Sequence, residues 1–154
     1  MRKALFASTL LLLAPLAASA DEAKGHVMRG SDLAWGPTPA VMPKGGQMAV
    51  LAGDPAKEGP FIVRLKAPAG YKVPAHNHPT GEFITVVSGT FAVGMGDKLD
   101  ETKTDKLKAG DSVNLPAGMN HFAIISEESV VQISSIGPFK ITYVNPADDP
   151  SLTQ

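Results

Sequence analysis

The chain of 154 residues contains no cysteine. Without a thiol it can form no disulfide framework, thiolate zinc site or iron–sulfur cluster, and it offers neither a cysteine nucleophile nor a cysteine for lipid attachment. Charge of one sign is also lacking, since 14 basic and 15 acidic side chains give a formal net charge of −1. This balance provides no broad electrostatic basis for binding nucleic acid or an acidic membrane surface. Any metal site must therefore be built from histidine and carboxylate side chains.

Apolar side chains and turn-forming residues are what the chain has in quantity. Hydrophobic residues make up 44% and charged residues 19%, which is typical of a globular protein and not of a disordered chain. Glycine and proline contribute 15 and 13 residues, and few stretches favour a helix. Short strands separated by many turns are therefore expected.

The longest apolar stretch lies at the N-terminus, in residues 1–20. Arg2 and Lys3 come first, apolar residues follow up to Ala17, and Ala18-Ser19-Ala20 supplies a small-x-small cleavage pattern. These are the parts of a secretory signal peptide. A transmembrane anchor is disfavoured because the stretch is short for the roughly 20 residues that span a bilayer, and polar residues and a proline interrupt it. We expect a periplasmic or secreted protein with no membrane anchor after cleavage.

The rest of the chain is expected to fold as one domain. Residues 21–46 show little periodicity and predict an extended lead-in, with Trp35 as its anchor. Residues 47–145 predict an all-β, antiparallel domain, and residues 146–154 a frayed tail. Strands spaced by roughly 8–12 residues between turn signals are typical of a sandwich or barrel. The expected strands are Gln47–Ala52, Phe61–Lys66, Glu82–Ser88, Thr90–Gly94, Ser112–Leu115, Phe122–Ser126, Val130–Ile136 and Lys140–Val144, with a solvated hairpin loop over 98–108.

Arginine is scarce where a ligand-binding interior would need it. Alternation along Phe61–Lys66 puts Arg64 on the face opposite to the apolar residues, so it is expected to face solvent. The one other arginine after the leader, Arg29, lies in the lead-in. The interior is therefore expected to lack a guanidinium clamp for a carboxylate or phosphate.

Three of the four histidines fall in two short segments. On a strand, positions i and i+2 point the same way, so His76 and His78 can present two imidazoles to one point. A turn after them can bring Glu82 back toward the same point, whereas His121 must arrive from another strand. Three imidazoles and a carboxylate would make a mixed nitrogen and oxygen metal site with room for water or substrate. The fourth histidine, His26, lies in the lead-in and needs no role.

The spacing of these residues resembles the two signatures of the cupin superfamily. Order, residue type and spacing all agree. One position departs from the pattern, because Ile125 stands where the second signature commonly ends in asparagine. The residues that carry the first signature are Gly70, His76, His78, Glu82 and Gly89, and those that carry the second are Gly110, Pro116, Gly118 and His121.

The resemblance implies a small secreted single-domain cupin, an antiparallel β-barrel of the jelly-roll type. It implies that His76, His78, Glu82 and His121 are the ligands of one divalent transition metal ion, which could be Mn, Fe, Ni, Cu or Zn. A small-molecule ligand or substrate is implied as the partner, and a homodimer formed through edge strands is compatible with it. The expected pocket walls are Phe83 or Ile84, Val86, Phe91, Val93 and Phe122 or Ala123, with Met48, Met95 and Met119 at the rim.

Three functions remain open for such a protein. The first is a non-enzymatic exported barrel that binds a metal ion and a small molecule. The second is a metal-dependent oxygenase or isomerase acting on a small oxygenated substrate, which would need an acid or base beyond the ligands; Tyr71 and Tyr143 are weak candidates. The third is a metal-free cupin of the sugar-epimerase type, against which the intact ligand set and the missing interior arginine count.

Overall fold

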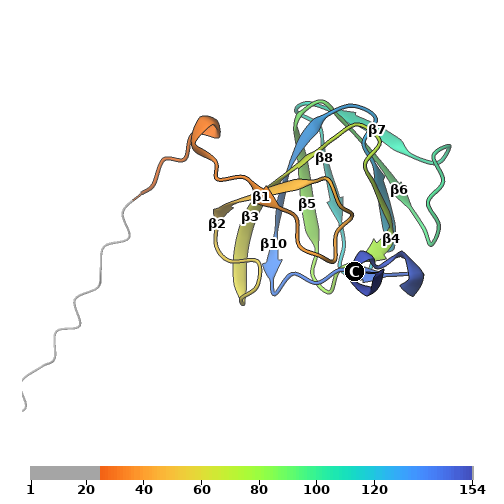
Figure 1. Ribbon diagram of the computed structural model, residues 1–154. Coiled ribbons are helices and arrows are strands. Elements are labelled where there is room, and N and C mark those ends of the chain that lie inside the picture. Colours follow the sequence, from red (N-terminus) through yellow and green to blue (C-terminus); the bar gives the residue numbers. More distant parts are fainter. Residues whose placement is uncertain (1–24, 154) are drawn as a thin grey trace, which may run out of the picture.

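The computed structural model describes residues 25–153, so the predicted signal peptide, residues 1–20, lies outside the described residues. The described chain is all-β, as predicted, and its strands form two antiparallel sheets that face each other in a jelly-roll barrel (Figure 1). Among residues 25–153, no helix is long and apolar enough to cross a membrane. Three 3-10 helices lie outside the sheets: Gly30–Asp32 in the lead-in, and Pro146–Asp148 and Pro150–Thr153 in the tail.

The two sheets divide the strands unequally. All strand pairings between neighbours are antiparallel. The larger sheet has the order β1 (Gly36–Pro37), β2 (Gln47–Ala52), β3 (Gly59–Ala67), β10 (Ser129–Gly137), β5 (Glu82–Ser88) and β8 (Ser112–Leu115). The smaller sheet has the order β11 (Thr142–Tyr143), β4 (Lys72–Asn77), β9 (His121–Ile124), β6 (Thr90–Met95) and β7 (Asp105–Lys108).

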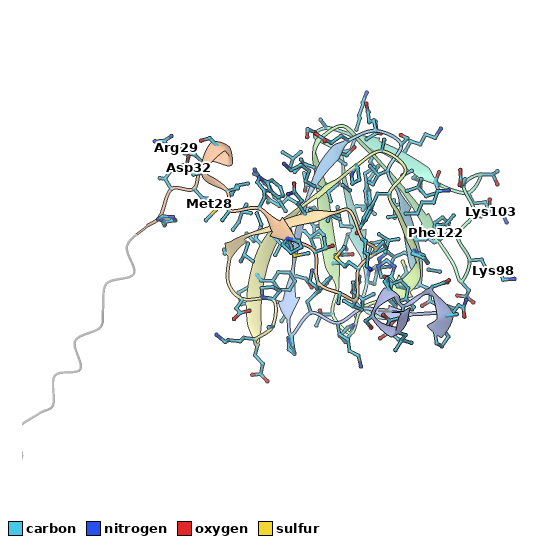
Figure 2. All side chains as sticks on the ribbon, viewed as in Figure 1. Met28, Arg29, Asp32, Lys98, Lys103 and Phe122 are labelled. Carbon is cyan, nitrogen blue, oxygen red and sulfur yellow. The ribbon has the colours of Figure 1, made fainter. Side chains whose placement is uncertain are left out.

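The core lies between the sheets and follows the predicted alternation. In β3 the side chains of Phe61, Val63 and Leu65 are buried. Burying each contributes roughly 1.5–3 kcal/mol. Arg64 lies on the opposite face, as predicted, where its Nε donates to Gln132 Oε1 of β10 at 3.2 Å. Arg29 is exposed on the lead-in, well away from the barrel (Figure 2). The cavity described below therefore contains no arginine.

Two predicted segments differ from the observed strands. The stretch before His76 forms β4, which the sequence analysis did not list as a strand, because Pro74 and polar residues interrupt its apolar pattern. The register of β4 with β9 shifts between Val73 and His76, at this proline. β7 lies within residues 98–108, where a loop was predicted. It is an edge strand with no buried residue, so it carries no hydrophobic pattern that could reveal it.

The lead-in is held against the barrel by three side chains. The Lys66 ammonium lies 4.6 Å from the centre of the Trp35 ring. The Tyr143 hydroxyl donates to Val41 O at 2.8 Å, and the Tyr71 hydroxyl donates to Pro43 O at 2.7 Å. Met42, between these two carbonyls, is only 7% exposed. The lead-in thus brings one of its own side chains into the barrel.

Candidate metal centre

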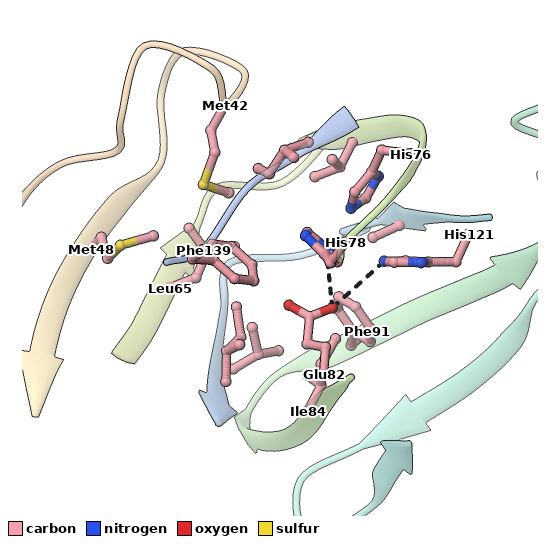
Figure 3. Close-up of a pocket in the computed structure, with 15 residues that line it drawn as sticks. Met42, Met48, Leu65, His76, His78, Glu82, Ile84, Phe91, His121 and Phe139 are labelled. Atoms are coloured by element: carbon pink, nitrogen blue, oxygen red, sulfur yellow. Dashed lines mark ion pairs between the residues drawn. The ribbon is translucent and has the colours of Figure 1, made fainter. Parts of the chain in front are cut away.

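A cavity lies inside the barrel, and its wall divides into two chemically different parts (Figure 3). Only four of the lining side chains are polar, and they gather at one end. Figure 3 shows Met42, Met48 and Phe139 toward the other end. The polar residues are His76, His78, Glu82 and His121, the set that the sequence analysis selected.

Strand pairing brings the two histidine segments together. His76 on β4 pairs with His121 on β9, and Glu82 is the first residue of β5 in the opposite sheet. The turn before His121 contains Gly118, whose φ of 74° favours glycine, and its amide donates to His78 O at 2.8 Å. The second segment is therefore tied to the first by the backbone as well as by the sheet.

The four side chains converge at a buried point. One ring nitrogen from each of the three histidines lies within 4.8 Å of the others. Glu82 Oε2 lies 3.5 Å from the Nε2 atoms of both His78 and His121 (Figure 3). All four residues are at most 5% exposed. The three imidazoles thus form one compact group, and the Glu82 carboxyl lies beside two of them.

Each imidazole is oriented by a main-chain carbonyl on its other nitrogen. His76 Nδ1 bonds to Pro74 O at 2.7 Å, and His121 Nδ1 bonds to Met119 O at 2.9 Å. His78 Nδ1 bonds to Lys140 O at 2.9 Å. A carbonyl can only accept, so each Nδ1 carries the proton. In a neutral ring, Nε2 then presents a lone pair.

Burial disfavours a positive charge on two of the three rings. Burial, the main cause, lowers the pKa of His76 to about 3. Burial also lowers the pKa of His78, even though the nearby Glu82 carboxylate acts in the opposite direction. Both rings are therefore neutral at neutral pH. Among the described residues, the buried His78 Nε2 has no hydrogen-bond partner.

A divalent cation fits this set of donors. Three Nε2 lone pairs and a carboxylate oxygen repel one another when nothing lies between them, because all four are acceptors. Three nitrogen donors and one oxygen donor suit divalent transition metals, and backbone partners on the far ring nitrogens are usual for histidine ligands. His76, His78, Glu82 and His121 are therefore the residues that could hold such an ion.

Hydrogen bonds between two asparagines and an aspartate connect the two histidine segments, and the sequence pattern did not predict them. Asn77 Nδ2 donates to Asn120 Oδ1 at 2.7 Å, and Asn120 Nδ2 donates to Asp97 Oδ1 at 2.7 Å. Asn77 lies between His76 and His78, and Asn120 directly precedes His121. Adjacency to the predicted ligands is the signal that could have found both asparagines.

The expected pocket residues are confirmed in part, and each of the two alternatives is resolved. The outward-facing Phe83 is 48% exposed, whereas its neighbour Ile84 lines the cavity. Ala123 lines the cavity in place of Phe122, which packs against Gly94. Met48 and Phe91 are confirmed. The remaining expectations fail as follows: Val86 and Val93 are core residues outside the lining, and Met95 and Met119 are exposed away from it.

The tyrosines and Ile125 have structural roles. The hydroxyls of Tyr71 and Tyr143 are bound to lead-in carbonyls. Burial raises the pKa of Tyr71 to about 12 and also raises the pKa of Tyr143. Neither is thus suited to proton transfer at neutral pH. Ile125 is 2% exposed in the hydrophobic core and does not line the cavity.

Comparisons with known proteins agree with this architecture. A family model described as a cupin domain matches residues 63–136. Germin-like protein subfamily 3 member 3 of Arabidopsis thaliana is 32% identical over 69 residues, which cover 44% of this chain and 33% of that protein. The matched segment thus spans about a third of the length of this relative.

Solved structures share the fold at low sequence identity. The polyketide cyclase RemF from Streptomyces resistomycificus has a TM-score of 0.69 at 14% identity, covering 83% of this chain and 91% of that one. A proposed acetylacetone dioxygenase from Methylibium petroleiphilum has a TM-score of 0.62 at 22% identity, covering 82% and 85%. An RmlC-like cupin from Shewanella frigidimarina has a TM-score of 0.57 at 19% identity, covering 75% and 94%.

Proposed function

This chain belongs to the cupin superfamily, and we propose that it is an exported, metal-binding cupin that binds a small molecule at a mononuclear centre. In this proposal His76, His78, Glu82 and His121 are the ligands of one divalent transition metal ion. The observation that carries it is the contact of each Nδ1 atom with a main-chain carbonyl. The Nδ1–H group of each ring donates to a carbonyl, so the three Nε2 lone pairs face one shared point beside the Glu82 carboxyl, where a metal cation could accept them.

The proposed ligand set leaves room for a further ligand. Four protein donors leave about two positions open on an octahedral ion. A bound ion would supply Lewis acidity toward an oxygen atom of the small molecule. The side chains themselves orient the donors and, through the apolar wall, restrict water. Because the donors are imidazole and carboxylate, Mn, Fe, Ni, Cu and Zn all suit the set, with intrinsic affinity rising toward Cu.

Metal content of the exported protein tests the proposal. Untagged protein should be purified from the periplasm and measured by mass spectrometry of metals, with one ion per chain expected. His78→Ala removes one proposed ligand and should lower occupancy sharply while circular dichroism still reports a folded barrel. His26→Ala is the matched control, because His26 is an exposed lead-in residue far from the cavity. Wild-type protein that holds no metal even after supplementation would contradict the proposal.

Export is supported by the sequence of residues 1–20. The basic start, the apolar stretch and Ala18-Ser19-Ala20 together predict cleavage after Ala20. Cell fractionation followed by intact mass measurement tests this, and the mature chain should begin at Asp21. A cytoplasmic protein that retains residues 1–20 would contradict export without affecting the metal centre.

A metal-dependent oxygenase or isomerase is the second candidate. It is favoured by the cavity, which adjoins the four polar side chains directly and could seat a substrate beside them. Glu82 is the only carboxylate in the lining, so it would have to serve both as ligand and as base. Oxygen consumption by metal-loaded protein with phenols, thiols and organic acids separates the two functions. Stable metal binding without turnover favours the binding protein.

A further inference from the structure

We propose that the small molecule bound here has an uncharged, apolar body, and that its only polar atoms are those that reach the four-residue polar end of the cavity. This inference rests on the proposed function and specifies the chemical class of its ligand. It follows from the division of the cavity wall, in which hydrogen-bonding groups are confined to one end (Figure 3).

The rest of the wall offers a ligand no hydrogen-bonding side chain. It contains no lysine, arginine, serine, threonine, asparagine, glutamine, tyrosine or tryptophan. A buried polar group without a partner is costly, and an unpaired buried charge far more so. A sugar, a phosphate or a second carboxylate would therefore lose its hydration without compensation. The eleven apolar lining residues are Met42, Met48, Leu65, Val73, Ile84, Phe91, Ala123, Val131, Ile133, Phe139 and Ile141.

The cations that lie near the barrel wall point elsewhere. Arg64 bonds to Gln132 on the outer face of the larger sheet, and Lys66 covers the Trp35 ring. Lys140 contributes its backbone carbonyl to His78 Nδ1, and its side chain does not line the cavity. Within residues 25–153, no lysine or arginine side chain is thus part of the cavity wall to pair with an anionic group of the ligand.

One wall is rigid and the other can adapt. The Phe139 ring stacks on His78 with centroids 4.5 Å apart at 19°, and Phe61 packs against Phe139 edge-on. Met42 and Met48 line the cavity as unbranched, flexible thioether side chains, which can adjust to the shape of a ligand. The body of the ligand would therefore lie along the Phe139 face and extend toward the two methionines.

The cavity also limits the size of the ligand. About 40 Å³ of the cavity is open to the centres of water molecules. A short hydrocarbon body of a few carbon atoms fits this space. A longer body would have to displace Met42, whose neighbouring carbonyls are held by Tyr143 and Tyr71.

A series of hydroxamates with one metal-binding head tests the inference. Acetohydroxamate, propionohydroxamate and butyrohydroxamate differ only in methylene groups. In succinic monohydroxamate and β-alanine hydroxamate, a carboxylate or an ammonium replaces the terminal methyl group of butyrohydroxamate. Affinities for metal-loaded protein are measured by titration calorimetry, and affinities for the free ion are measured in parallel as the reference.

We expect affinity to rise about fourfold with each methylene, after correction for the free ion. Both charged analogues should bind at least about 100-fold more weakly than butyrohydroxamate, because their charge would be buried without a partner. A flat alkyl series, or equal binding of a charged analogue, would overturn the inference. If the wild-type chain holds no metal, the proposed function fails instead, so the two failures are distinguishable.

A charge substitution in the wall sharpens the test. Met48→Lys puts a cation beside the body of the ligand and should strengthen binding of succinic monohydroxamate by about tenfold or more, while butyrohydroxamate weakens. Met95→Lys is the matched control, since Met95 is 46% exposed outside the cavity, and it should leave both affinities unchanged. An unchanged preference in folded, metal-loaded Met48→Lys protein would contradict the placement of the body. If Met48→Lys does not fold, the ligand series on the wild-type chain still decides.

Discussion

The two ends of the cavity are built on different principles. At the polar end, one nitrogen of each histidine ring bonds to a main-chain carbonyl, which orients the ring. One nitrogen of each ring also lies within 4.8 Å of those of the other two rings. At the apolar end, Met42 and Met48 are fixed only by packing and by the course of the backbone. In the proposed function, the polar end would fix where the ion lies, whereas the apolar end could adjust to the molecule that the ion binds.

The two ends of the cavity also come from different parts of the chain. Three of the polar residues come from β4, β5 and β9, and the fourth, His78, directly follows β4. Met42 comes from the lead-in, which contributes little to either sheet. Substitutions at the apolar end that change which small molecule fits would thus leave the four polar residues in place.

Removal of the metal should destabilise the protein most. An ion that binds only the folded chain adds about 4 kcal/mol when its concentration is 1,000 times the Kd. For a chain of this size, this corresponds to a Tm lower by roughly 10 °C after chelation. Differential scanning calorimetry of loaded and chelated protein measures the change. His121→Ala should abolish the difference between the two forms, and a chelation effect that survives in His121→Ala would place the ion elsewhere.

Acidification should destabilise the metal-free protein through the same end of the cavity. The pKa of His76 is about 3 in the folded chain, against 6.5 for the ordinary side chain of an unfolded chain. Between pH 3 and pH 6.5 the unfolded chain therefore binds more protons than the folded chain. Stability is therefore retained above pH 6.5 and falls as pH drops toward 3. The loss should be about 2 kcal/mol at pH 5, and the lowered pKa of His78 adds to it.

Urea unfolding of chelated protein at pH 7.5, 6 and 5 measures this loss. His76→Phe, which keeps an aromatic ring without a titrating group, should show a smaller loss over the same range. Because the apolar end contains no titratable side chain, Met48→Leu should show the wild-type dependence. Identical slopes for His76→Phe and the wild-type chain would show that acid acts elsewhere.

The hydrogen bonds of Asn120 should affect metal affinity without supplying a ligand. Asn120→Ala breaks both hydrogen bonds that join Asn77, Asn120 and Asp97. Residues that orient metal ligands typically contribute 10–100-fold in affinity, so we expect about a tenfold loss in competition with a chelator. Asn114→Ala is the matched control, because Asn114 is exposed on β8 and does not line the cavity. Equal affinities in the two variants would contradict the bracing role.

The four polar residues could be predicted from the sequence because residue type and spacing along the chain are enough to identify them. Period-two alternation places His76 and His78 on the same side of an extended segment, and turn residues precede Glu82 and His121. The larger sheet was also predictable where apolar alternation is clean: β2, β5 and β8 were predicted with their observed bounds. β4 was not predicted because Pro74 interrupts its apolar pattern. β7 was not predicted because it has no buried residue and so no apolar alternation.

The partners of the histidines were not predictable for a physical reason. Main-chain carbonyls, such as Lys140 O for His78, exist at every residue and leave no mark in the sequence. Tyr71 and Tyr143 hold the lead-in on both sides of Met42, and both contacts join residues far apart in the chain. Such contacts depend on the assembled fold, whereas the signature spacings are local.

The two tyrosine hydroxyls provide the mildest test of the comparison. Tyr143→Phe removes the donor to Val41 O, and Tyr71→Phe removes the donor to Pro43 O. Each substitution should lower the free energy of unfolding by about 1 kcal/mol, since each removes one hydrogen bond between uncharged groups. Metal affinity should stay unchanged, because neither hydroxyl bonds to a histidine ring. Butyrohydroxamate affinity should change by a few-fold in the double variant, in which Met42 is released on both sides. Altered metal affinity together with unaltered hydroxamate affinity would reverse the assignment of roles to the two ends.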